Sequence, residues 1–137
     1  MLPSEILIEA KGLFGKYGQR WTRGVLNRPG VFGRNYCSIG AIQAVGGSGN
    51  CAARDYLRKV IEEETGKIMA VEDFNDTGTS SPRLRHMPLW LSISILLLSL
   101  LPGIRLIRWF KIRRVWCRAI KLALDDEMKE TEGEQVC

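Results

Sequence analysis

Apolar residues recur at helical spacing in three segments of the first half of this chain. The first helix is expected to follow Ser4, the second to lie within YCSIGAIQAVGG at residues 36–47, and the third to run from Asn50 to Thr65. Ser4, Asn35 and Asn50 stand where an N-cap side chain accepts a hydrogen bond from the first backbone N–H groups. The N-terminal part is therefore predicted to be helical.

The remaining N-terminal segments show no periodic pattern. Residues 19–35 contain the Pro29-Gly30 turn and further glycines, and we interpret them as a loop. Since no segment alternates apolar and polar residues, no strand is expected and the fold class is predicted to be all-α. A domain this small closes a single core. Its expected anchors are Trp21, Cys37, Ala41, Tyr56, Leu57 and Phe74.

A long apolar block follows the N-terminal domain. Residues 87–104 carry no charge, and a helix of this length spans about 27 Å, close to the thickness of a bilayer core. One continuous helix is predicted over Leu89–Leu101, up to Pro102-Gly103. We interpret it as membrane-associated, because a soluble core helix needs neighbours on all sides and the small domain offers few. That soluble packing is the alternative.

The block and the segment after it differ in the surface that each is expected to contact. The side chains expected to face lipid are Leu89, Trp90, Leu91, Ile93, Ile95, Leu96, Leu97, Leu98, Leu100 and Leu101. The side chains expected to contact an anionic surface are Arg105, Arg108, Lys111, Arg114, Arg118 and Lys121. In the alternative interpretation these basic residues form the solvated face of a helix packed on the domain. The chain thus divides into residues 1–81, 82–114 and 115–137.

Charge is distributed unevenly along the 137 residues, whose net charge is +5. Residues 77–124 hold nine Lys or Arg and no acid, whereas residues 125–137 hold six acids and one Lys. A basic block beside an apolar block favours anionic lipid as partner over nucleic acid, and a protein partner stays open. The positive-inside rule places the C-terminus in the cytoplasm, and a re-entrant block keeps both ends there. We expect location at a bacterial or host-cell inner membrane, or otherwise in the cytoplasm.

Residues with reactive side chains are few. The four cysteines form no C-x-x-C pair and His86 is the one histidine, so neither a metal site nor a cofactor is expected. Cys37 near a helix N-terminus is a candidate nucleophile, with His86 as base and Asn75 or Asp76 to orient it. A buried structural thiol is the alternative reading of Cys37. A binding role is predicted rather than catalysis, with a cysteine hydrolase as a further alternative.

Four short motifs occur in order along the chain. They are RWTRG at 20–24, YCSIGAI at 36–42, AARDYLRKVI at 52–61 and VEDFND at 71–76. With RAIKLA at 118–123, this pattern resembles a small domain of unknown function from phages and actinobacteria, with W-T-x-G, C-x-x-G-A and W-N-D motifs. The resemblance covers residues 5–79 and resumes at 115–124; Phe74 stands where the family has Trp. The resemblance implies a phage or bacterial accessory protein with an inserted or replaced segment. It does not indicate any particular activity.

Overall fold

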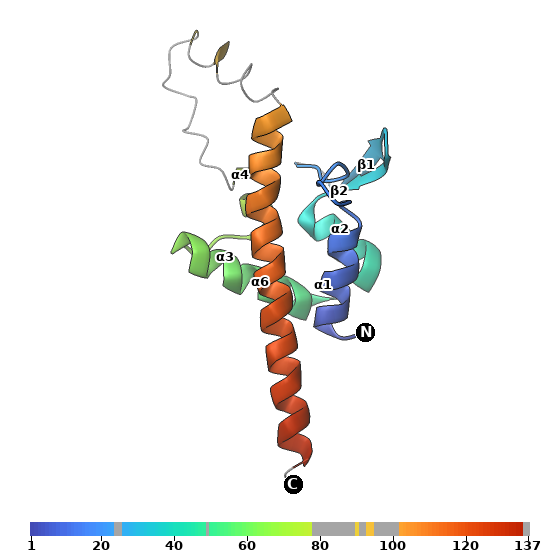
Figure 1. Cartoon of the computed structure of the whole chain (residues 1–137), viewed down its shortest axis with the longest axis vertical. Coiled ribbons are helices and arrows are strands. Elements are labelled where there is room, and N and C mark those ends of the chain that lie inside the picture. Colours follow the sequence, from blue (N-terminus) through green and yellow to red (C-terminus); the bar gives the residue numbers. More distant parts are fainter. Residues whose placement is uncertain (24–25, 49, 78–89, 91–92, 95–101, 136–137) are drawn as a thin grey trace.

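The shorter elements pack along the upper two thirds of the long helix α6 (Figure 1). The computed structural model describes residues 1–23, 26–48, 50–77, 90, 93–94 and 102–135. Its elements are α1 (Pro3–Gly12), β1 (Asn27–Gly30), β2 (Gly33–Tyr36), α2 (Ser38–Gly46), α3 (Cys51–Thr65), α4 (Val71–Thr77) and α6 (Pro102–Gln135). Both α1 and α3 contact α6, and the C-terminal end of α6 projects beyond them.

One face of α6 is buried at the three- and four-residue spacing of an amphipathic helix. That face comprises Trp109, Ile112, Val115, Trp116, Ala119 and Ala123. Phe14, just after α1, meets Trp109 and Trp116 edge to face, with ring centroids 5.5 and 5.2 Å apart. Ala119 and Ala123 have small side chains, which lets neighbouring helices approach closely. Residues separated by about a hundred positions therefore share one core.

The predicted core is confirmed and proves to be larger than expected. Trp21, Cys37, Ala41, Leu57 and Phe74 are all buried in a single cluster, and the partly buried Tyr56 packs against it. The cluster also takes in the buried face of α6.

The prediction of an all-α fold is wrong in one respect, since β1 and β2 form an antiparallel hairpin. Asn27 pairs with Tyr36 and Gly30 with Gly33, so Val31 and Phe32 form the tip. All of β1 is exposed and β2 is half-buried only at its end. A strand with no buried face shows no alternation of apolar and polar residues, which is why the sequence pattern missed it. Gly33 has φ +103°, a conformation that side chains disfavour.

Two of the three expected N-caps are also corrected. α1 begins at Pro3 with Leu2 as N-cap, and Cys37 rather than Asn35 caps α2. Ser4 lies inside α1, where its backbone N–H and hydroxyl donate hydrogen bonds of 3.0 and 2.6 Å to Glu127 of α6. Asn50 is the N-cap residue of α3, although its side chain donates backwards to the Gly46 carbonyl.

The apolar block lies almost wholly outside the described residues, and so does the predicted helix over Leu89–Leu101. Trp90 and Ile93 are exposed, and Ser94 Oγ donates to the Trp90 carbonyl at 2.8 Å. α6 begins at Pro102, a residue suited to the first turn of a helix, and passes unbroken through the expected boundary at residues 114 and 115. Among the described residues, no helix combines the length and apolarity needed to cross a bilayer.

Candidate functional site

The side chain of Asn75 joins three segments at the centre of the N-terminal domain. It is 3% exposed, and its Oδ1 accepts hydrogen bonds from Trp21 Nε1 at 2.8 Å and from Ser38 Oγ at 3.0 Å. Its Nδ2 donates to the Thr22 carbonyl at 3.1 Å. The amide thus uses both its donor and its acceptor, as a buried polar group must. Residues from the RWTRG, YCSIGAI and VEDFND motifs meet here.

Cys37 and Gly40 hold the start of α2 against the preceding loop. Cys37 Sγ accepts a hydrogen bond from Gly40 N at 3.3 Å, and the Cys37 N–H donates to the Leu26 carbonyl at 3.1 Å. A Cβ built on Gly40 would lie 1.8 Å from that same Leu26 oxygen. Gly40 is therefore required because the loop backbone approaches α2 closely. The motif residues Cys37 and Gly40 have structural roles.

The expected catalytic pair is not assembled within the described residues. Cys37 is 7% exposed and engaged in capping, while His86 lies outside the described residues. Cys51 and Cys117 are free and exposed. In the parts of the chain that the structure describes, no three His, Cys, Asp or Glu side chains are grouped to hold a metal ion.

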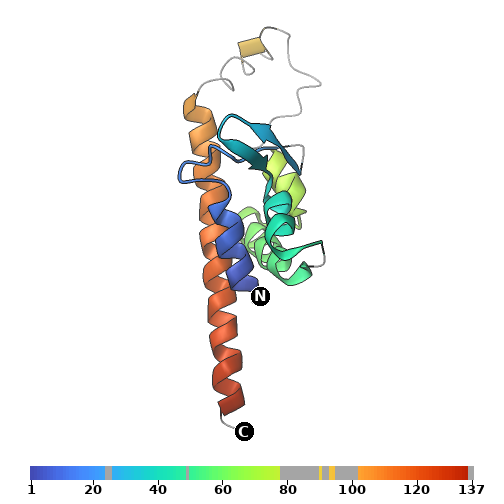
Figure 2. The same ribbon diagram turned by 90° about the vertical axis from the view of Figure 1, so that its right-hand side faces the viewer.

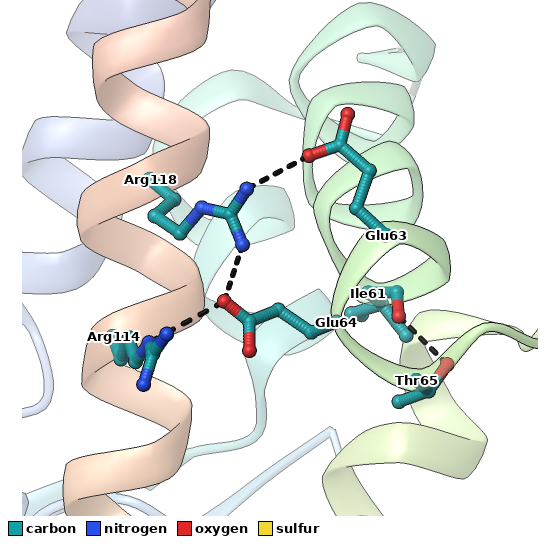
Figure 3. Close-up of polar contacts among 6 residues, drawn as sticks. All are labelled: Ile61, Glu63, Glu64, Thr65, Arg114 and Arg118. Carbon is teal, nitrogen blue, oxygen red and sulfur yellow. Dashed lines mark hydrogen bonds and ion pairs between the residues drawn. The ribbon is translucent and has the colours of Figure 1, made fainter.

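Of the six residues expected to contact an anionic surface, five have described side chains, and two of these five have carboxylate partners inside the molecule (Figure 3). Arg118 of α6 contacts Glu63 at 3.0 Å and also Glu64, both at the end of α3. Arg114 Nε lies 3.3 Å from Glu64. All four side chains keep contact with solvent, so this cluster guides α3 onto α6 at a modest gain in stability.

The other basic side chains of this set differ in exposure. Lys111 and Lys121 are exposed and form no ion pair with any described residue, whereas Arg108 is partly buried. Burial and then the charge of Arg23 lower the pKa of Arg108 below its ordinary value. The cavity between Arg108 and Asn75 holds about 10 Å³, roughly one water, so it has no room for a larger ligand. The side chain of Arg105 lies outside the described residues.

A second apolar feature, missed by sequence reasoning, lies at the tip of the hairpin. Val31 and Phe32 are 95% and 69% exposed. Arg28 and Arg34 stand on the two strands below them. Two features of the sequence could have indicated this tip. Val31 and Phe32 form an apolar pair between two glycines, and the surrounding residues 10–54 contain seven Lys or Arg and no acid.

The hairpin and the start of α6 lie at the same end of the molecule, opposite the C-terminus (Figure 2). There α6 exposes Leu106 and Ile107, and residues 102–124 contain no acid. We call Val31, Phe32, Leu106, Ile107 and the arginines of the hairpin the basic-apolar end. The acids of α6 begin at Asp125 and run toward the other end.

Comparison of the chain with protein family models, with characterised proteins and with solved structures found no match. The resemblance to a phage and actinobacterial domain stays a prediction.

Proposed function

We propose that this protein is a non-catalytic module that docks on anionic membrane surfaces through its basic-apolar end. The observation that carries the proposal is the exposed pair Val31 and Phe32 at the tip of an arginine-bearing hairpin. Large apolar side chains at a loop tip enter the interface between headgroups and acyl chains, and guanidinium groups beside them attract anionic headgroups.

Two properties of the basic-apolar end indicate that this end of the protein faces the membrane. The hairpin tip and the first turns of α6 expose apolar side chains on separate elements at one end of the molecule. The apolar block precedes Pro102 directly in the sequence, so the chain leaves the block at this same end. Docking through this end therefore turns the start of α6, rather than its acidic end, toward the membrane.

The basic-apolar end is expected to bind an anionic membrane reversibly and with moderate affinity. Burying an apolar side chain contributes about 1.5–3 kcal/mol, and each basic residue near an anionic surface about 1 kcal/mol. Partial insertion of Val31 and Phe32 with support from Arg28 and Arg34 therefore amounts to several kcal/mol. Because salt screens the ionic part, this contribution falls at high ionic strength.

Vesicle flotation of the full chain tests the proposal, with phosphatidylcholine vesicles that contain or lack phosphatidylglycerol. We expect binding to be stronger with the anionic lipid and to weaken with salt. Val31→Ser with Phe32→Ser, and separately Arg28→Gln with Arg34→Gln, should each reduce the anionic-lipid-dependent part. Ile68→Ser, in the connection between α3 and α4 and 84% exposed, is the matched control. Equal binding to both vesicle types by all variants would sink the proposal.

A further inference from the structure

α6 carries a second, mostly apolar stripe, which lies beside its buried face. We define the outer stripe as Phe110, Arg113, Cys117, Ile120 and Leu124. The steps between them alternate between three and four residues, which is the spacing of a coiled-coil contact line. Ile120 is half-buried at the edge of the core and the other four are exposed. Among the described residues, the core therefore leaves this line of α6 uncovered.

The charges of α6 show which occupant suits this stripe. Residues 105–114 carry five Lys or Arg and no acid, whereas residues 123–132 carry five acids and Lys129. A parallel pair of α6 helices would set like charges beside each other and Arg113 against its own copy. An antiparallel pair instead sets the basic half of each helix beside the acidic half of the other.

The geometry of α6 fits this arrangement. The midpoint of Pro102–Gln135 falls between Arg118 and Ala119. Two helices that overlap antiparallel along their whole length therefore bring Cys117 level with Ile120 and Arg113 level with Leu124. The basic segment 105–114 then lies level with the acidic segment 123–132, so the register that gives the longest overlap also brings the two oppositely charged segments to the same level.

A groove beside the stripe offers further basic groups. It lies between α1 and α6, has a volume of about 430 Å³, and is lined by Lys11, Lys16, Arg113 and Ile120 among others. Neither Lys11 nor Arg113 forms an ion pair with a described residue, and the same holds for the exposed Glu130 and Glu132. These groups are available to a second chain.

We propose that α6 pairs with α6 of a second copy of this chain, antiparallel and through the outer stripe. The pair carries one basic-apolar end at each extremity. Sedimentation of the full chain without lipid should show a dimer that dissociates on dilution. Met128 is exposed one helical turn after Leu124. Leu124→Lys with Met128→Lys should give a monomer at the concentrations at which the unchanged chain is a dimer, and Ile68→Lys should preserve the dimer. Circular dichroism should show equal helix content in all three proteins.

Crosslinking decides the direction of pairing. In a background with Cys51, Cys117 and Cys137 changed to Ser, Arg113→Cys chains are mixed with Leu124→Cys chains and treated with a short bismaleimide. We expect crosslinks in the mixture alone, because two copies of residue 113 lie about 16 Å apart along an antiparallel pair. Crosslinks within the Arg113→Cys chains alone, or a monomeric mass at every concentration, would overturn the proposal.

Discussion

Trp21 Nε1 donates a hydrogen bond of 2.8 Å to Asn75 Oδ1, although 54 residues separate them in the chain. Through this contact the loop before the hairpin is tied to α4, and Ser38 ties α2 to the same oxygen. Because the bond is buried, water does not replace it when one partner is removed.

We expect Asn75→Ala to lower the free energy of unfolding by about 2–4 kcal/mol, because buried groups of Trp21, Thr22 and Ser38 lose their partner. Asn75→Asp should also destabilise, since a carboxylate cannot donate to the Thr22 carbonyl and brings a buried charge. Urea unfolding followed by circular dichroism measures both. Asn27→Ala in the exposed hairpin should change stability by less than about 0.5 kcal/mol. An equally small effect at Asn75 would contradict the linking role.

Gly40 and Gly12 form a matched pair of helical glycines. Gly40→Ala should cost about 3 kcal/mol or more, because its Cβ would collide with the Leu26 carbonyl. Gly12→Ala should stabilise by about 0.5 kcal/mol, since its Cβ meets nothing within 4 Å and alanine favours helix. Opposite shifts in the midpoint of thermal unfolding are the expected result, and shifts of the same sign would refute the close approach of the loop.

The contact of Arg118 with Glu63 and Glu64 should have a small, salt-dependent effect. Arg118→Ala is expected to lower stability by about 0.5–1 kcal/mol at low salt and by less at high salt, because the pairs are half exposed. Lys121→Ala, which removes an exposed cation without an ion pair among the described residues, is the control. Urea unfolding at two salt concentrations measures the difference. A loss that does not depend on salt would point to packing rather than charge.

Tyr56 should titrate above its ordinary pKa of 10.0. Burial is the main cause of the raised pKa, followed by Asp126, whose carboxylate accepts a hydrogen bond of 3.3 Å from the Tyr56 hydroxyl. Because the folded pKa exceeds the unfolded one, the contribution of this group to stability is present below pH 10 and is lost as pH rises through the folded pKa. Ultraviolet titration of tyrosinate should lose a component that titrates above pH 10 in Tyr56→Phe. If the Tyr56→Phe curve differs from the curve of the unchanged chain in amplitude alone, the raised pKa of Tyr56 is disproved.

Cys37 should react with thiol reagents only when the fold opens. It is buried and caps α2, whereas Cys51 and Cys117 are exposed. In a variant with Cys51, Cys117 and Cys137 changed to Ser, we expect slow labelling by Ellman's reagent in buffer and rapid labelling in denaturant. Rapid labelling of the native variant would revive a nucleophilic role for Cys37.

Local patterns determined the helices of the N-terminal domain and most of its core. Regular apolar spacing predicted α1, α2 and α3, and Trp21, Cys37 and Leu57 proved to be buried as expected. Such patterns report which side of a helix is apolar, because burial acts on neighbours three and four positions apart. They do not report what covers that side.

Only the tertiary structure decided how α6 divides its apolar residues. Trp109 and Trp116 face α1 and the core, whereas Phe110 and Cys117, on the same side of a helical wheel, stay exposed. It also decided that Arg118 meets Glu63 and Glu64 and that an exposed stretch pairs as a hairpin. These outcomes depend on contacts between residues far apart in the chain. Such contacts produce no periodic pattern in the sequence around either residue, so local patterns do not predict them.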